Sequence, residues 1–386
     1  MAITINTSPA SGSTVHDALW HVVTSDNSGQ TDFKYVMDIY VGGIQKIRVK
    51  QFPEPGTGKA YFDAGPTVRN EMDYAWFEPI NSSAFVAEPD LSGQAGIVYD
   101  IRVGEDFSGV TTLNMASGQV TGYNWAPPLF GRRVVSLADK FNKWFTNRPL
   151  SAKTKLNENL FIPFYTAPGA SLTMHCDKFD ASNTQIGSTL NASPVTVEHG
   201  FLQCNIGTTA LSATFSTTFD DSVKYYDVWF EDYEKIRVYP TCNPKFTPIP
   251  IHFVNRWGMW ETHRFDLLNK LNMTVERKDF GQRDYRFNGN SVDYMSSSNR
   301  YYEGRVNYSN KANWTYKCIS NALTDAEYVW LAELFTSPQI LLETDGYFYP
   351  VTVKKNTYEY NQYVSDRLKA FEVEFEFNSA RMTQLR

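Results

Sequence analysis

The stretch FKYVMDIYVGG, residues 33–43, decides the fold class of this chain. Its side chains alternate between two faces, as they do along a β-strand. One face carries Phe33, Tyr35, Met37, Ile39 and Val41. The other face carries Lys34, Asp38 and Tyr40. Gly42 and Gly43 then predict a tight hairpin turn, and residues 44–52, IQKIRVKQF, return as the partner strand.

Similar short alternating runs recur along the chain, separated by turn residues. Residues 97–109, IVYDIRVGEDFSG, form one such run. Near the C-terminus, residues 368–379 place Phe371, Val373, Phe375 and Phe377 on one face and glutamates on the other. The 23 Tyr, 26 Phe and 9 Trp residues also favour strands. The sequence therefore predicts a mainly β fold.

With 386 residues, the chain is too long for one ordinary core, so we expect three modules. Residues 1–150 are expected to form a β-sandwich-like domain that ends in a helix. Residues 151–241 are expected to form a second small β-sandwich, Ig-like or jelly-roll, with no helical pattern to interrupt it. A proline-rich connector, residues 240–250, then leads into residues 242–386, a C-terminal α+β domain with few helices.

Two segments have helical spacing. Residues 136–149, SLADKFNKWFTNRP, have Ser136 as a cap and repeat apolar side chains at Leu137, Phe141, Trp144 and Phe145. Residues 323–335 begin with a capping box of Thr324 and Glu327, in which each side chain bonds the backbone of the other residue. Pro338 is expected to end this second helix.

Composition argues against several classes of protein. The net charge of −6 is unfavourable for a protein that recognises nucleic acid, which needs a basic face. The beginning of the chain has no signal-peptide pattern, and no apolar run is long enough to span a membrane. We therefore expect that the protein does not insert into a membrane and that it is made and kept in a cytosol. No C-x-x-C pair occurs, which predicts free buried thiols. The cysteines are Cys176, Cys204, Cys242 and Cys318.

The best local match to a chemical motif is PGTGKA, residues 55–60, which is similar to a phosphate-binding loop. The match fails because the first glycine of the motif is missing, Ala60 replaces the hydroxyl residue that holds magnesium, and no amphipathic helix follows. We expect a surface loop.

Other combinations of reactive residues are equally weak. The six histidines include no H-E-x-x-H pattern, and no G-x-S-x-G elbow is present, although a cysteine nucleophile beside a distant histidine stays open. Residues 220–221 and 231–232 are acidic pairs of the kind a glycosidase or a calcium site uses, but we expect turn formers there. We therefore predict no catalytic residue, no metal site and no cofactor.

Aromatic residues leave a second function open. Trp257, Trp260 and Trp314 stand near polar residues, so an exposed tryptophan shelf for a sugar is one interpretation, and packing in a core or subunit interface is the favoured one. Residues 275–290 mix both charges, which favours a solvated hairpin or a polar interface.

Several of these segments resemble a family of virion proteins from tailed phages of Bacteroidetes, a circle that includes the crAss-like phages. The resemblance rests on residues 33–41, 52–65, 136–149, 330–360 and 368–377. It implies a tail, neck or baseplate component, a ring subunit built of β-sandwich modules, which resides in the virion after assembly in the bacterial cytoplasm. The implied partners are copies of the chain in a ring and other tail, neck or portal-side proteins. No functional residue carries over from the family.

The residues agree with such a role, because a ring subunit needs rigid domains and apolar anchors at subunit boundaries rather than a cofactor. Residues 1–13 contain few core residues, and we expect them to extend across a neighbouring subunit. Two alternatives stay open: a carbohydrate- or cell-surface-binding module, which predicts an exposed aromatic shelf, and a hydrolase, which predicts converging carboxylates in a deep cleft.

Overall fold

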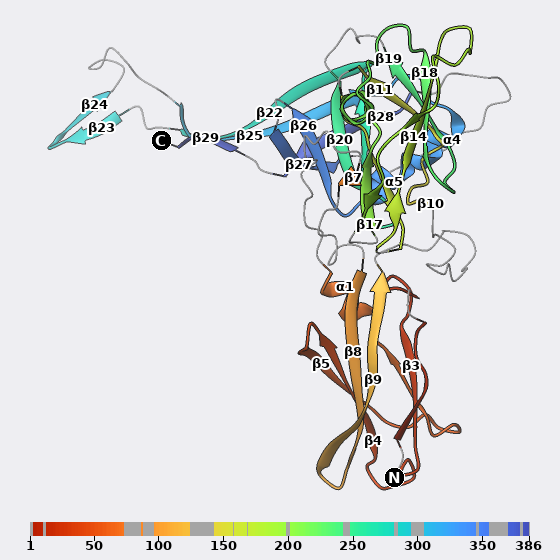
Figure 1. The fold of residues 1–386 in the computed structure, drawn as a ribbon. Helices are drawn as coiled ribbons and strands as arrows, with labels where there is room; N and C mark the ends of the chain where they lie inside the picture. The colour runs from red at the N-terminus through yellow and green to blue at the C-terminus, as the bar shows by residue number, and fades with distance from the viewer. Residues whose placement is uncertain are drawn as a thin grey trace. The chain divides into compact units, whose positions relative to one another are not determined.

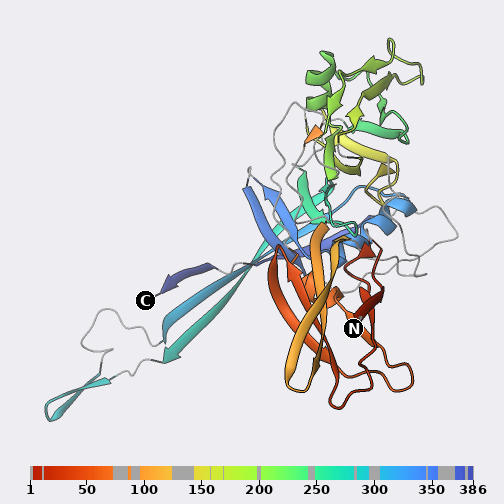
Figure 2. The same ribbon diagram turned by 60° about the horizontal axis from the view of Figure 1, so that its bottom comes forward.

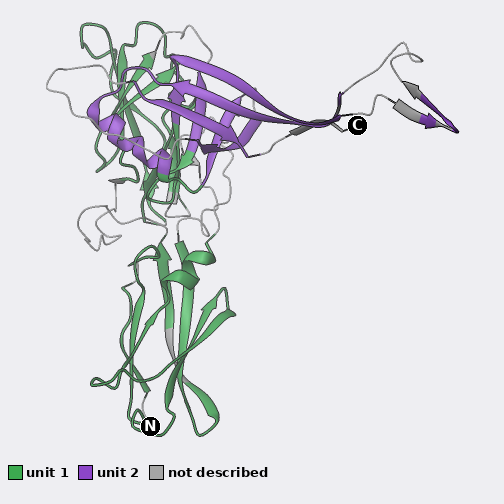
Figure 3. Cartoon of the chain, turned by 180° about the vertical axis from the view of Figure 1, so that it is seen from behind, with its two compact units in different colours: residues 1–243, 253–262, 336–338 green, residues 244–252, 263–335, 339–386 purple. Residues whose placement is uncertain are grey.

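The computed structural model is mainly β. It describes residues 3–10, 13–72, 86–87, 96–123, 143–156, 158–167, 169–197, 201–241, 248–281, 285–294, 305–344, 347–354, 370–378 and 381–385. The chain divides into two compact units, coloured separately in Figure 3. Unit 1 comprises Met1–Asn243, Phe253–Thr262 and Thr336–Pro338. Unit 2 comprises Pro244–His252, His263–Phe335 and Gln339–Arg386.

Two sheets make up the first part of unit 1 (Figure 1). One has the order β1 (Ile3–Thr7), β3 (Trp20–Ser25), β6 (Ala60–Asp63). The other has the order β2 (Ser13–Thr14), β9 (Val110–Tyr123), β8 (Gly96–Phe107), β4 (Lys34–Val41), β5 (Ile44–Gln51). A short helix, α1 (Gly65–Asn70), follows β6. Both sheets contribute to one hydrophobic cluster, the N-terminal core, whose buried members run from Ile3 to Val120.

The predicted hairpin of residues 33–52 is confirmed. β4 pairs antiparallel with both β5 and β8, so it is a central strand. Its predicted apolar face lies in the N-terminal core, where Tyr35, Met37 and Ile39 are fully buried. Gly42 and Gly43 both have positive φ angles, 57° and 77°, which a tight hairpin turn requires. On the other face, Asp38 is also fully buried and accepts two hydrogen bonds from Arg48 of β5.

The expectation for residues 1–13 is wrong where the structure describes them. Ile3–Thr7 forms strand β1, which pairs antiparallel with β3, and the side chain of Ile3 is buried in the N-terminal core. Alternation of Ile3 and Ile5 with threonine is enough to make this short run a strand rather than an extension toward a neighbour. Residues 1, 2, 11 and 12 lie outside the described residues.

The second part of unit 1 contains three further sheets. One has the order β10 (Lys143–Trp144), β12 (Phe161–Tyr165), β17 (Phe201–Asn205), β7 (Val86–Ala87). The next has the order β11 (Ser151–Lys155), β19 (Ile236–Thr241), β18 (Tyr225–Phe230), β14 (Met174–Phe179), β15 (Leu190–Asn191). A small third sheet pairs β13 (Ser171–Leu172) with β16 (Val195–Thr196). Their shared cluster, the middle core, runs from Trp144 to Val238.

Two predictions for this part need correction. Helix α2 (Thr208–Phe215) interrupts the region expected to hold strands alone, and Ala210 and Leu211 are fully buried. The helix predicted over residues 136–149 lies mostly outside the described residues, and its described end is not helical. Trp144 belongs to β10 and packs in the middle core, so pairing with β12 overrides the helical spacing there.

The proline-rich segment 240–250 also differs from the expected connector at both ends. Pro240 lies in β19, in register with Thr154 of β11, and Pro250 lies in β20 (Ile249–Val254). The residues between, 242–247, are outside the described part of the chain.

An eight-stranded sheet dominates unit 2. Its order is β21 (Trp260–Phe265), β20, β26 (Ile340–Thr344), β27 (Tyr347–Val353), β28 (Glu372–Phe377), β25 (Arg305–Ile319), β22 (Leu268–Gly281), and β29 (Arg381–Leu385) also pairs with β25. A separate hairpin pairs β23 (Tyr285–Asn288) with β24 (Ser291–Tyr294). The predicted alternation near the C-terminus is confirmed, because Phe371, Val373 and Phe375 are buried while Glu372 and Glu376 are exposed.

The second predicted helix is confirmed with one interruption. Thr324 and Glu327 form the capping box of α4 (Asp325–Trp330), and α5 (Ala332–Thr336) follows. The helical segment ends before Pro338, as predicted. Trp330 and Leu334 bury their side chains.

Candidate functional site

The outer face of the sheet formed by β14, β18 and β19 gathers polar and aromatic side chains. On these strands the inward residues, such as Tyr226, Val228 and Phe230, belong to the middle core. The outward residues form a second set, which we call the outer ladder: His175, Asp177, Phe179, Tyr225, Asp227, Trp229, Lys235, Arg237 and Tyr239. Strand register aligns them, with His175 opposite Trp229, Asp177 opposite Asp227, and Asp227 opposite Arg237.

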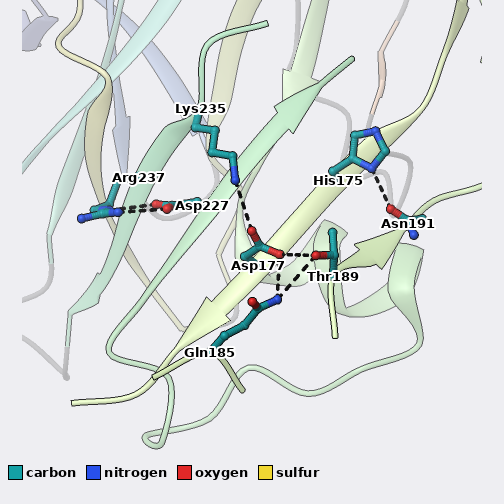
Figure 4. A network of polar contacts seen from close by, with 8 residues as sticks. All are labelled: His175, Asp177, Gln185, Thr189, Asn191, Asp227, Lys235 and Arg237. Carbon is teal, nitrogen blue, oxygen red and sulfur yellow. Dashed lines mark hydrogen bonds and ion pairs between the residues drawn. The ribbon is translucent and has the colours of Figure 1, made fainter. Parts of the chain in front are cut away.

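Two aspartates at the centre of the outer ladder are neutralised by two cations (Figure 4). Asp227 accepts hydrogen bonds of 2.8 and 2.9 Å from the guanidinium of Arg237. These bonds raise the pKa of Arg237 above its usual value. Asp177 lies 3.2 Å from the ammonium of Lys235 and also accepts hydrogen bonds from Thr189 and Gln185. Each carboxylate is thus held by donors of the protein itself.

The aromatic rings of the outer ladder contact the same two cations, Lys235 and Arg237, and stack on neighbouring rings. The ammonium of Lys235 lies 3.7 Å from the ring centre of Trp229, and the rings of Trp229 and His175 stack at 5.3 Å. Arg237 covers Tyr225 at 4.3 Å, and Tyr225 stacks on Phe179 at 4.7 Å. Cation–π contacts of this kind fix side chains in place on a solvated sheet face.

The outer ladder does not have the arrangement of a glycosidase. Such a site needs one carboxyl group that holds a proton and a second that faces the sugar. Asp177 and Asp227 are both mostly buried and both accept hydrogen bonds from cationic side chains. The arrangement supports a rigid, charge-balanced surface. An aromatic shelf for a sugar would require a ligand that displaces Lys235 from the ring of Trp229.

A second surface lies in unit 2, on the antiparallel strand pair of β22 and β25, which we call the arm. These strands have 14 and 15 residues, whereas β26, β27 and β28 have 5, 7 and 6. Figure 2 shows the arm running beyond the main body of its sheet, with β29 paired to β25 in the outer part. Nearly every side chain of β22 is exposed.

One face of the arm is apolar. Leu271, Met273 and Val275 share this face and are 50%, 52% and 37% exposed. Their cross-strand partners on β25 are Tyr316, Trp314 and Ala312. We call these six residues the arm stripe. Register with β28 places Tyr316 beside Phe375, which is fully buried, so the arm stripe continues the core-facing side of the sheet.

The structure brings His175 and Glu231, two of the residues considered from sequence, close together. The loop of residues 55–60 runs directly into strand β6, so no helix follows it as a phosphate-binding loop requires. Asp220 accepts hydrogen bonds from Ser222 in a turn, and Asp232 has a positive φ of 69°; both are exposed turn residues, as predicted. The Nδ1 atom of His175 lies 2.7 Å from Oδ1 of Asn191, and its Nε2 atom lies 3.9 Å from Oε1 of Glu231.

The tryptophans divide between core and surface. Trp257 and Trp260 are buried in unit 1, where Trp257 packs on Phe145 at 5.3 Å, so core packing is confirmed for both. Trp314 is half-buried in the arm stripe. Residues 275–281 are exposed strand, as the balanced charges predict.

The thiols are buried and unreactive where the structure describes them. Cys176, Cys204 and Cys318 are free and buried, as predicted. Burial raises the pKa of all three, that of Cys318 to about 12, so each stays protonated at neutral pH. Cys242 lies outside the described residues.

Within the described ranges, no group of three or more His, Cys, Asp or Glu side chains is arranged to hold a metal ion. Among the helices that the structure describes, none has the length and hydropathy to cross a membrane.

Sequence reasoning missed the outer ladder and the apolar stripe of the arm, although it predicted the exposure of residues 275–281. The outer ladder had a signal in YYDVWF, residues 225–230, where Asp227 alternates with core residues, but its partners come from other strands. The arm had a signal in the alternation of Leu271, Met273 and Val275. The chain matches no protein-family model and no curated protein sequence.

Proposed function

We propose that this chain is a structural, non-enzymatic component of a phage virion, a tail, neck or baseplate ring subunit. It assembles through protein–protein contacts with copies of itself and with other tail, neck or portal-side proteins, and it resides in the virion. The segments that resemble the phage virion family support the identity of the particle. The arm supports the mode of action and is the observation that carries the proposal.

The arm leaves an apolar surface exposed in the isolated chain. β25 has a third strand beside it, β28 along residues 315–319 and β29 along residues 309–312. Leu271, Met273 and Val275 nevertheless stay exposed on β22. A contiguous exposed apolar patch rimmed by polar residues is typical of a protein–protein interface. The arm is therefore expected to become buried on assembly.

The sandwich modules are part of the same proposal. Two sheets contribute to the N-terminal core, and two larger sheets contribute to the middle core, which supports two β-sandwich modules. The second module also takes β7 and β10, which precede residue 150. Residues 242–386 are proposed as the α+β module. Rigid modules of this kind suit a ring subunit, whose contacts must repeat with a fixed angle.

The first experiment measures the mass of the purified protein by light scattering across a range of concentrations, with electron microscopy of the same samples. We expect oligomers, and closed rings in the images. Particles purified from an infected host should contain the chain. Its absence from such particles, together with a monomer at every concentration, contradicts the proposal.

A carbohydrate- or cell-surface-binding module is the second candidate, favoured by the stacked aromatic rings of the outer ladder. Glycan-array binding by the wild-type protein that is lost in Trp229→Ala and kept in Trp257→Phe would support it. Trp257 is the matched control because its ring is buried in unit 1. No binding on the array would leave the assembly role as the better proposal.

A further inference from the structure

Strand β22 is the last strand of its sheet, and no described strand pairs with its outer edge. An edge strand presents a row of outward N–H and C=O groups, which natural proteins shield with charged side chains, prolines, bulges or short length. β22 has 14 residues and no proline, and its register with β25 is regular from Leu268 to Lys278. Its charged side chains are Lys270 and those of residues 276–279, so the edge between them is unshielded. The outer edge of β22 is thus a template on which another strand can pair.

The sequence of this edge is complementary to itself. Residues 270–276 read KLNMTVE. When two copies of this run lie antiparallel with Met273 facing Met273, Lys270 of one copy faces Glu276 of the other. In the same register Leu271 faces Val275, and Asn272 faces Thr274. Each facing pair is therefore cation with anion, apolar with apolar, or polar with polar.

We propose that two copies of this chain pair their β22 strands antiparallel about a twofold axis at Met273, which joins two sheets into one. The occupant of the edge is a second copy because the complementarity lies within one segment. The proposal goes beyond the proposed function and rests on it only in taking self-assembly as the mode of action. A twofold contact makes pairs, so ring closure uses other surfaces.

This pairing also merges the two apolar faces. Facing residues of paired strands project to the same side of a sheet. Leu271, Met273 and Val275 of both copies then lie side by side, next to Trp314 and Tyr316 of each arm. The polar residues of the run gather on the opposite side. One joined sheet therefore has a continuous apolar stripe that neither copy has alone.

Neighbouring registers are less favourable. A slip by one residue puts Leu271 opposite Glu276 or Thr274, and a one-residue slip moves a whole set of side chains to the wrong face. A slip by two residues in one direction puts Lys270 opposite Lys278, a like-charge pair that destabilises a sheet. The register about Met273 is thus the one that the charges and the apolar residues both select.

The decisive experiment is a disulfide cross-link with Met273→Cys in the full chain. In the proposed register, residue 273 faces itself with Cα atoms about 4.5–5.5 Å apart, within the range of a disulfide. Mild oxidation should give a covalent species of twice the mass of the 44.1-kDa chain on a non-reducing gel. Wild-type protein, which keeps its four native cysteines, should give none.

Lys278→Cys is the matched control on the same exposed strand. In the proposed register the two copies of residue 278 lie about 34 Å apart, so they do not cross-link. Equal cross-linking of both variants, or of neither, overturns the proposal.

Charge reversal gives an independent test by sedimentation equilibrium. Lys270→Glu changes two Lys–Glu pairs into Glu–Glu pairs and should weaken self-association by about tenfold. The double variant Lys270→Glu with Glu276→Lys restores opposite charges and should recover most of the affinity. Lys278→Glu, the same change outside the paired run, should have little effect. Unchanged circular dichroism shows that each variant folds.

The outcomes separate this pairing from the proposed function. A wild-type chain that oligomerises while Met273→Cys fails to cross-link and Lys270→Glu has no effect overturns the β22 pairing alone. A chain that stays monomeric and shows no cross-link at high concentration overturns the pairing and counts against self-assembly.

Discussion

Strands β4 and β22 have similar alternating patterns and lie in opposite environments. β4 is central, paired on both sides, and has Tyr35, Met37 and Ile39 fully buried. β22 is an edge strand whose apolar residues Leu271 and Met273 are about half exposed. Alternation therefore predicts a strand, but the position of the strand in its sheet decides which apolar side chains contribute to stability.

The largest expected effect comes from shortening a matched apolar side chain on each strand. Ile39→Ala leaves a cavity in the N-terminal core and should lower the free energy of unfolding by about 3 kcal/mol. Leu271→Ala removes atoms that are half exposed and should change it by less than about 0.5 kcal/mol. Urea unfolding at low protein concentration measures both. Similar losses in the two variants would show that the arm is buried within the isolated chain.

The second effect is a pH dependence of stability, which a buried histidine near the N-terminal core should cause. His21 is fully buried beside Tyr99 in the first part of unit 1, and burial lowers its pKa to about 4, although nearby Asp63 opposes the shift. Below pH 6.5 the unfolded chain binds a proton that folded His21 does not, so stability falls as the pH decreases toward 4. At pH 5 the loss should be about 2 kcal/mol relative to pH 7.

His21→Gln is the control for this pH effect because glutamine does not titrate. Urea midpoints at pH 7 and pH 5 should differ less in the variant than in the wild type. An unchanged difference would assign the acid sensitivity to other groups.

The sequence was sufficient for features that depend on neighbours along the chain. The β4–β5 hairpin follows from alternation and from Gly42 and Gly43. The capping box follows from Thr324 and Glu327, three residues apart. These patterns are local, so the residues that decide them lie within one short window.

Features that depend on distant partners were not predicted. Trp144 has helical spacing, but its place in β10 depends on pairing with β12. Burial of Asp38 depends on Arg48 across the hairpin, and burial of Asp227 depends on Arg237 of β19. The outer ladder and the arm stripe arise from strand register, which no single stretch of the sequence determines.

The third effect tests whether unit 2 draws stability from its helices rather than from the arm. The hydroxyl of Thr324 accepts a hydrogen bond from the backbone of Glu327 at 3.2 Å, and the Glu327 carboxylate accepts one from the Thr324 backbone at 2.8 Å. Thr324→Ala should cost about 1 kcal/mol in urea unfolding, and Thr324→Ser should cost less because serine also caps. If serine is as harmful as alanine, the methyl group rather than the cap is responsible.

The smallest effect compares the two exposed surfaces, because Lys235 of the outer ladder has an ion pair and a ring contact, whereas Leu271 and Met273 of β22 are about half exposed. Lys235 covers Trp229 and pairs with Asp177, yet its side chain is 52% exposed. Lys235→Met keeps the length of the side chain and its contact with the ring but removes the charge, and Asp177 keeps Thr189 and Gln185 as donors. The variant should lose less than about 1 kcal/mol of stability in urea. That loss should shrink further at high salt, which screens exposed charges. A loss independent of salt would instead mean that packing on Trp229 holds the outer ladder together, as apolar contacts do in the cores.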